Sequence, residues 1–309
     1  MSSFIITLTA VAVMLGYAVP GFLLVKTKHI QKESIKSFAK VLMYVCSPCL
    51  TVYTIINTPF EMRIVIDAII VFVVSLAVQV FMILFFKFVF RKKYHEIKYR
   101  VCIIATAMGN CGFMGVPLLE AVMPEHPEAV VMSTSFCLGM TMMGWTLSSY
   151  IISDDKSYMS LQKAFLNPAT ISLIVAAPIF VWGIHIPMQL NNMITLLGKM
   201  SAPMCMLIMG MRLATMDLRS MFTDISLYGI IAIKQIGMPL LVYGIMSLLP
   251  VDPYLVKTMF VLSAAPIASM VQNYAEMIGQ GQKKAANLVL VGTMMSIVTL
   301  PIMMFIVYG

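Results

Sequence analysis

The sequence has few charged residues for its length. Asp, Glu, Lys and Arg make up 11% of its 309 residues, whereas a soluble protein usually has about 25%. Hydrophobic residues make up 60%. A globular domain of this size would lack the polar side chains to cover its surface, so the composition excludes a soluble enzyme, a soluble nucleic-acid-binding protein and a disordered chain. We predict an all-α polytopic membrane protein.

Signatures of catalysis and of metal binding are also lacking. There is no His-Glu-x-x-His motif, and the few histidines lie in connections or at the ends of apolar runs, at His29, His95, His126 and His185. All six cysteines lie inside apolar runs, and the pair Cys46 and Cys49 has no second pair and no nearby histidine, which favours packing over a metal or redox site. We expect no enzyme activity, no catalytic residue, no metal, no cofactor and no nucleic-acid partner.

Long apolar runs are what the sequence does contain. Each is about long enough to cross a hydrocarbon core of about 30 Å. Ten runs can be counted, at 4–25, 34–57, 64–88, 98–122, 127–152, 167–186, 190–213, 224–249, 253–279 and 284–308. A backbone in lipid must satisfy its own hydrogen bonds and no alternating barrel pattern is present, so we predict ten transmembrane helices.

The basic residues are distributed unevenly between the connections. Of the 21 Lys and Arg residues, 17 lie in or beside alternate connections. These are Lys26, Lys28, Lys32, Lys36, Lys40, Lys87, Arg91, Lys92, Lys93, Lys98, Arg100, Lys156, Lys163, Arg212, Arg219, Lys283 and Lys284. Such connections face the cytoplasm, which predicts a multi-pass protein of the plasma (inner) membrane with both termini outside.

The two halves of the chain share a proline pattern. Prolines in corresponding runs are offset by 158, 155 and 149 residues, in the pairs Pro20 and Pro178, Pro48 and Pro203, and Pro117 and Pro266. Five helices per half is an odd number, so the second half enters the membrane upside down. We predict two inverted five-helix repeats, at residues 1–153 and 164–309.

The fourth and ninth runs each contain helix-breaking residues. The fourth has three glycines and a proline within 109–117, and the ninth has Pro266 among small and polar residues. Interrupted helices in corresponding halves point to the binding site of a transporter. Free backbone N–H groups at such breaks attract anions, and free carbonyls attract cations.

These motifs resemble a known family. The stretch from Gly109 to Leu118 matches the signature GNxGFxGxPL of the auxin efflux carrier family, which includes bacterial malonate-type carriers and the plant PIN-formed auxin transporters. Further matches cover Leu166–Pro168, the span-7 pattern from Pro203 to Leu213, Pro266–Ser269 and Thr299–Pro301. The resemblance therefore covers nearly the whole chain.

The resemblance implies a fold similar to the NhaA antiporter and the bile-acid carriers. In such folds helices 1, 2, 6 and 7 form a scaffold, helices 3–5 and 8–10 form a transport core, and the broken helices 4 and 9 cross. Here Asn110–Pro117 would cross Ser263–Ser269, with the substrate near Cys46, Ser47 and Pro48. Members typically move organic anions, and some relatives form dimers, so we expect a homodimer and membrane lipid among the partners.

We therefore predict a secondary active transporter of a small organic anion by alternating access. The substrate would be a carboxylate such as malonate, malate or an auxin-like indole acid. The predicted substrate-binding residues are Asn110, Cys111, Gly112, Gly115, Pro117, Ser263, Pro266, Ser269, Asn273, Cys46, Ser47 and Pro48. The alternative is a non-transporting membrane sensor or lipid-binding receptor on the same fold.

Polar residues inside the runs are candidates for ion coupling. Lys234 lies about ten residues into its run, roughly 15 Å deep, and buried ionisable groups in membranes are costly and often functional. It could carry a coupling proton or face the substrate carboxylate, or it could be a structural cation on free carbonyls. Gln79 lies at a similar depth, and Gln272 could bind Na⁺ or simply pair between helices. The coupling ion would be H⁺ or Na⁺.

Other charged residues lie nearer to the ends of the runs. Asp67, Glu120 and Glu276 are expected at the membrane interface. Lys199 could draw anions toward the mouth of a pathway, or its ammonium could extend outward to the interface.

Overall fold

Apolar helices make up most of the chain. The computed structural model describes residues 3–216 and 223–308, so Arg219, one of the predicted cytoplasmic cations, lies outside the described residues. Eight helical segments there are long and apolar enough to cross a membrane. They are Ser3–Lys26, Lys32–Ile56, Met62–Val89, Ala129–Ser153, Lys156–Trp182, Met188–Ala214, Ile225–Ser247 and Gln282–Tyr308. The chain is therefore built as a multi-pass membrane protein.

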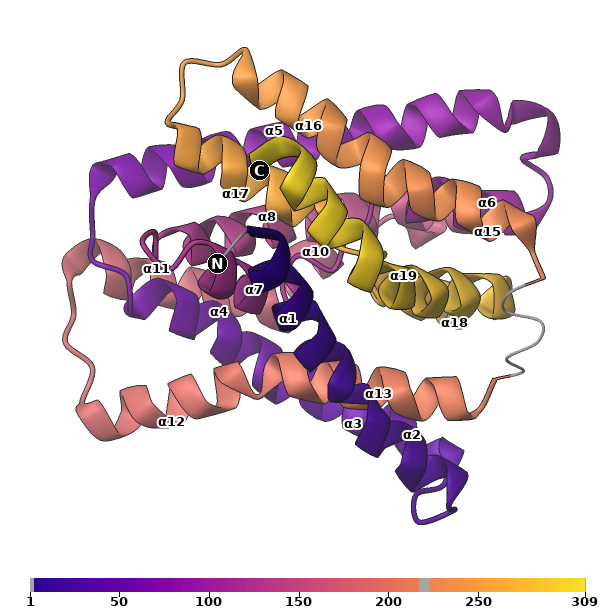
Figure 1. The fold of residues 1–309 in the computed structure, drawn as a ribbon, viewed down its shortest axis with the longest axis horizontal. Helices are drawn as coiled ribbons and strands as arrows, with labels where there is room; N and C mark the ends of the chain where they lie inside the picture. Colours follow the sequence, from indigo (N-terminus) through magenta and orange to yellow (C-terminus); the bar gives the residue numbers. More distant parts are fainter. Residues whose placement is uncertain (1–2, 217–222, 309) are drawn as a thin grey trace.

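Most of these segments consist of more than one helical element (Figure 1). In chain order they are α1 (Ser3–Gly16) and α2 (Ala18–Lys26), then η1 (Lys32–Ser34), α3 (Ile35–Val41), η2 (Leu42–Cys46) and α4 (Ser47–Ile56), then α5 (Met62–Val89) and the short η3 (Arg91–Lys93). Next come α8 (Ala129–Met143), η4 (Gly144–Ser148) and α9 (Ser149–Ser153), followed by η5 (Lys156–Tyr158), α10 (Leu161–Phe165) and α11 (Pro168–Trp182). The rest are α12 (Met188–Lys199) and α13 (Ser201–Ala214), then α15 (Ile225–Ala232), η6 (Ile233–Gly237) and α16 (Met238–Ser247), and finally α19 (Gln282–Tyr308).

The fourth and ninth predicted runs are each two short helices with a break between them. The fourth is α6 (Ile97–Ala105) and α7 (Gly115–Val122), and the ninth is α17 (Pro253–Ala264) and α18 (Met270–Ile278). Glycines in the first break and Pro266 in the second end the helices where the sequence indicates. The count of ten spans and the inverted repeat stay predictions.

Prolines also shape the continuous segments. Pro48 and Pro239 lie in the first turns of α4 and α16, directly after the π-helical turns η2 and η6. A proline has no N–H to give to the carbonyl one turn earlier, and a π turn absorbs the resulting mismatch. Asn167 begins α11: its Oδ1 accepts the amides of Ala169 and Thr170, and Pro168 follows at the first helical position.

The helices pack in two groups. In one, α2 lies against α13 and α4 lies against α11 and α12. In the other, α5 lies against α8 and α16 lies against α17, with α19 packed on α1 of the first group. This pairing places both broken helices beside α8 and α19.

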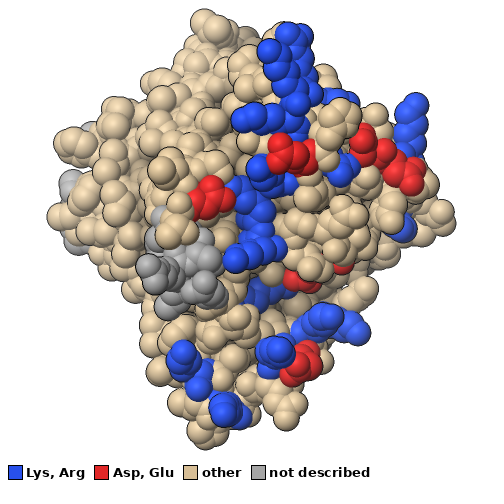
Figure 2. Space-filling model, turned by 90° about the vertical axis from the view of Figure 1, so that its right-hand side faces the viewer, with Lys and Arg blue, Asp and Glu red and all other residues tan. Residues whose placement is uncertain are grey.

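Connections predicted on opposite sides of the membrane lie at opposite ends of the structure. The α5–α6 and α18–α19 connections are on the right of Figure 1, and the α4–α5 and α11–α12 connections are on the left. Seen from the right, Lys and Arg side chains gather on this face and acidic ones are fewer (Figure 2). The uneven charge agrees with the distribution in the sequence; which side of the membrane this face meets stays a prediction.

Candidate functional site

The two interrupted stretches meet at the centre of the molecule. Gly109 and Ile267 form an isolated antiparallel bridge. The Asn110 amide donates to the carbonyl of Pro266 at 2.7 Å, and the Ala268 amide donates to the carbonyl of Met108 at 3.0 Å. Backbone groups that the breaks remove from the helices are thereby paired with each other. We call residues 106–114 and 265–269 together the crossing.

A buried lysine supports one side of the crossing. The Lys234 ammonium, on the π turn η6, donates to the carbonyls of Ser263 at 2.6 Å and Ala265 at 3.0 Å. Lys234 is 0% exposed. These carbonyls belong to the C-terminal end of α17, where a cation is stabilised by unpaired acceptors. Of the roles open for Lys234 from the sequence, the geometry supports the cation on free carbonyls.

Glycine makes room for that ammonium. A Cβ at Gly109 would lie 2.9 Å from Lys234 Nζ and 3.4 Å from the carbonyl oxygen of Ala265. With any other residue at this position, the end of the lysine side chain would have to shift away from its place beside the backbone. The signature glycine at this position therefore has a physical reason.

Backbone donors are left over at the crossing. Among the described residues, no acceptor hydrogen-bonds to the amides of Gly112 and Phe113, ahead of α7, or of Ser269 and Met270, at the start of α18. All four residues are half-buried. Free N–H groups at the start of a helix carry positive partial charge and attract an anion such as a carboxylate.

The predicted site residues are distributed around this centre. Cys111, Gly112, Gly115 and Pro117 lie in the first break or at the start of α7, and Ser263, Pro266, Ser269 and Asn273 lie at the second break or in α18. Asn110 is 8% exposed, and its side chain lies near the thiol of Cys205 on α13. Cys205 is a contact that the sequence analysis missed, because only the packing of α13 brings it to the crossing.

The three residues predicted from the second run lie at a helix junction. Cys46 is buried at the end of η2, and Ser47 and Pro48 are half-buried at the start of α4. The carbonyl of Ser47 accepts from the hydroxyl of Thr51 at 3.3 Å. No described hydrogen bond joins these three side chains to the crossing.

Gln79 and Gln272, the two side-chain amides predicted to take part in ion coupling, differ in their surroundings. Gln79 on α5 is fully buried, and neither of its amide atoms has a hydrogen-bond partner among the described residues. Gln272 donates to Glu276 at 3.0 Å, and Glu276 lies 3.8 Å from Arg212 on α13. The oxygen of Gln272 is buried without a partner in the described part of the chain.

Asp67 is covered by neighbouring side chains. Asp67 is 6% exposed, accepts a hydrogen bond from the Tyr254 hydroxyl and lies 3.9 Å from Arg63. Tyr254 of α17 covers Asp67, and the position of Asp67 at the membrane interface stays a prediction. Glu120 and Glu276 are exposed, and each contacts a neighbouring helix as well.

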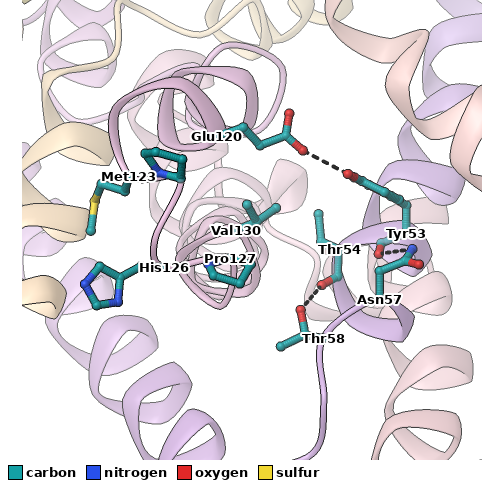
Figure 3. A pocket seen from close by; sticks show the side chains of 10 residues that line it. Tyr53, Thr54, Asn57, Thr58, Glu120, Met123, His126, Pro127 and Val130 are labelled. Atoms are coloured by element: carbon teal, nitrogen blue, oxygen red, sulfur yellow. Dashed lines mark hydrogen bonds between the residues drawn. The ribbon is translucent and has the colours of Figure 1, made fainter. Parts of the chain in front are cut away.

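A cavity of about 250 Å³ opens beside α4 and α7 (Figure 3). Its lining residues are Tyr53, Thr54, Asn57, Thr58, Glu120, Met123, Pro124, His126, Pro127 and Val130. Tyr53 and Glu120 point toward each other across it, and the Tyr53 hydroxyl donates to Glu120 at 2.9 Å (Figure 3). The ammonium of Lys199 lies 5.3 Å from the centre of the Tyr53 ring.

Two comparisons with known proteins concern membrane transport. A family model described as "Membrane transport protein" matches residues 6–304. The chain is 24% identical over 212 residues to a protein of Rhizobium meliloti (strain 1021) named "Putative malonate transporter". That match covers 66% of this chain and 65% of the relative, so it spans a little less than two thirds of the relative's length.

Proposed function

Since the chain belongs to this family of membrane transport proteins, we propose that it is a secondary active transporter of a small organic anion. The substrate is a carboxylate, in the class of malonate, malate or an auxin-like indole acid. It binds at the crossing and is carried by alternating access. The chain does no covalent chemistry on it.

One observation carries the proposal: four backbone amides without an acceptor among the described residues lie at or just before the starts of two half-helices whose breaks pair with each other. Gly112 and Phe113 precede α7, and Ser269 and Met270 begin α18. A carboxylate has two oxygens and can accept from both sets. The side chain of Asn110, next to the first set, would orient it. The name of the Rhizobium relative adds a dicarboxylate as the first substrate to try.

The contacts around the crossing suit alternating access. Near one end, Glu120 of α7 accepts from Tyr53 of α4. Near the other, Glu276 of α18 lies beside Arg212 of α13. Each joins a broken helix to a helix of the group that contains α2 and α13. In our proposal these two polar contacts break and form in turn as the pathway opens to either side.

The wider architecture follows from the same proposal. Ten spans form two inverted repeats, with helices 1, 2, 6 and 7 as scaffold and helices 3–5 and 8–10 as transport core. The basic face lies in the cytoplasm of a cell bounded by the plasma membrane, and both termini lie outside. H⁺ or Na⁺ drives transport, with Gln79 and Gln272 as the polar groups that lack full partners.

Reconstituted protein in liposomes tests the proposal. Radiolabelled malonate, malate and indole acetate are offered under imposed pH, Na⁺ and voltage gradients. We expect accumulation of one acid that collapses with one gradient. Asn110→Ala should lower uptake at least about tenfold if the amide orients the carboxylate, since a lost hydrogen bond to a charged group costs about 1.5–3 kcal/mol.

A matched control separates the site from general damage. Asn192 is exposed on α12, and Asn192→Ala should transport like the unmodified chain. Equal uptake by folded Asn110→Ala and Asn192→Ala proteins would refute the site. Absence of flux for every acid under every gradient, in a folded protein, would refute the transporter.

A further inference from the structure

Two cysteines from different elements come into contact at the crossing. Cys111 lies in the first break and is 0% exposed, and Cys137 lies on α8 and is partly exposed. Their sulfur atoms are 3.1 Å apart, and both are free thiols. Among the described residues, no other two cysteine sulfurs form a hydrogen-bond contact with each other.

The backbone around the pair fixes this approach. The hydroxyl of Ser133, one turn before Cys137 on α8, donates to the carbonyl of Cys111 at 2.7 Å. Gly112 has no side chain, and a Cβ there would lie 3.2 Å from the sulfur of Cys137. The hydrogen bond therefore ties α8 to the first break, and the glycine leaves room for the sulfur of Cys137. The proposed carboxylate site uses backbone amides and the Asn110 side chain, not these two sulfurs.

We propose that Cys111 and Cys137 are a peroxide-sensitive dithiol that closes into an intramolecular disulfide. A disulfide has an S–S distance of about 2.05 Å, so the sulfurs need to move by only about 1 Å. The bond would link the first break to α8 covalently. It is a modification site separate from the carboxylate position.

The chemistry balances with one molecule of hydrogen peroxide. The more exposed Cys137 gives up its thiol proton and attacks a peroxide oxygen as the thiolate. The O–O bond breaks, and the leaving hydroxide takes up that proton, so a sulfenic acid and water form. The thiol of Cys111 then attacks the sulfenic sulfur, the S–S bond forms and a second water leaves. The two sulfurs lose two electrons in all, and these reduce the peroxide to two waters.

Closure of the bond would act on transport. Cys111 follows Asn110 directly, so drawing its sulfur toward α8 turns the peptide that carries the proposed carboxylate ligand. We expect oxidised protein to take up substrate several-fold more slowly than reduced protein. This consequence rests on the proposed function, whereas formation of the bond does not.

Mass spectrometry of the purified chain in lipid nanodiscs tests the bond itself. After hydrogen peroxide and alkylation of the remaining thiols, we expect a loss of two hydrogens and a cross-linked peptide pair containing Cys111 and Cys137. A reducing thiol should reverse both. Cys137→Ser should abolish the link, whereas the double variant Cys46→Ser, Cys49→Ser should keep it as the matched control.

Each outcome has a definite meaning. Full alkylation of both thiols after peroxide would overturn the proposal and leave a thiol–thiol hydrogen bond only. Sulfinic acid on Cys137 without the link would overturn it as well. If the link forms and uptake by an active protein stays the same, the effect on transport is refuted. If reduced protein shows no uptake at all, the proposed function fails while the dithiol stands.

Discussion

The two breaks of the crossing are alike in backbone and unlike in support. In the second, the ammonium of Lys234 holds two carbonyls at the end of α17. In the first, the chain supports itself: the Thr106 amide donates to Cys102 and the Met108 amide donates to Ile104, which closes the end of α6. One half of the crossing therefore depends on a single distant side chain, and the other depends on local turns.

Two buried polar residues at corresponding places in the predicted repeat show the same difference. Gln79 precedes Lys234 by 155 residues, the same offset that separates Pro48 from Pro203. Lys234 has two acceptors, while the Gln79 amide has no partner within the described residues. If the predicted repeat holds, one half carries a buried support and the other carries an amide without a described partner at the matching position.

Removing the lysine should have the largest effect. Lys234→Met keeps most of the volume but leaves two buried carbonyls without donors, at a cost of about 3 kcal/mol or more. Thermal unfolding in detergent should shift clearly downward, and uptake should be lost. Lys98→Met, at an exposed lysine of the basic face, is the control. Unchanged unfolding of the Lys234 variant would show that the support is dispensable.

Crowding the lysine should come next. Gly109→Ala places a Cβ 2.9 Å from Lys234 Nζ, so the ammonium must give up part of its hydrogen bonding. Overpacking of this kind costs about 1–3 kcal/mol. At Gly244, in α16, a Cβ would meet nothing within 4 Å, so Gly244→Ala provides a matched comparison by the same thermal unfolding. Equal shifts in the two variants would contradict the argument.

The unsatisfied amide gives a prediction of opposite sign. Gln79→Leu removes two buried polar atoms that have no described partner, and burying an unpaired polar group costs about 1–3 kcal/mol. The variant should unfold at the same or a higher temperature. If Gln79 serves the coupling ion, uptake should fall while stability holds. A large loss of stability would mean that the amide is paired.

The breaks in the two helices were predictable from the sequence, whereas the side-chain contacts around them were not. Gly109 and Pro266 predicted the breaks because both residues disfavour helix at those points. The burial of Lys234 could be expected from its place inside an apolar run, but its acceptors could not, because the run does not say which carbonyls a neighbouring helix leaves free. The thiol contact of Cys111 depends on how α8 is rotated, which sequence spacing does not specify.

A weaker effect should come from one of the polar contacts between the helix groups. Tyr53→Phe removes one hydrogen bond to the exposed Glu120, which is worth about 0.5–1.5 kcal/mol. In our proposal this contact holds one end of the pathway closed, so the initial uptake rate should change more than the unfolding temperature. Tyr44→Phe, at an exposed tyrosine of η2, should change neither.

The smallest effect concerns the start of the helix that carries the lysine. Asp224 caps α15 through Ser226, whereas Glu61 before α5 makes no such bond. Hydrogen bonds from Lys284 at 2.7 Å and from Ser226 lower the pKa of Asp224 below its ordinary 3.8. Its stabilisation is therefore present above pH 3.8 and is lost as pH falls through the lowered pKa.

An acid titration checks that sign. Asp224→Asn should lower stability at neutral pH by about 0.2–1 kcal/mol, because the pair is partly exposed, and the gap to the unmodified chain should close below the lowered pKa. A gap that widens on acidification would contradict the assignment. Unfolding in detergent at a series of pH values measures it.

The contact between α2 and α13 has a mechanical consequence. A Cβ at Gly21 would overlap the carbonyl of Leu207, and one at Gly210 would overlap the carbonyl of Ala18. The two backbones therefore touch with no side chain between them. Sliding α2 along α13 would bring a residue with a side chain to the place where a glycine now lets the two backbones touch. The two helices are therefore expected to move together as a rigid pair. In the proposed alternating-access mechanism, the movement that carries the substrate therefore takes place between other helices.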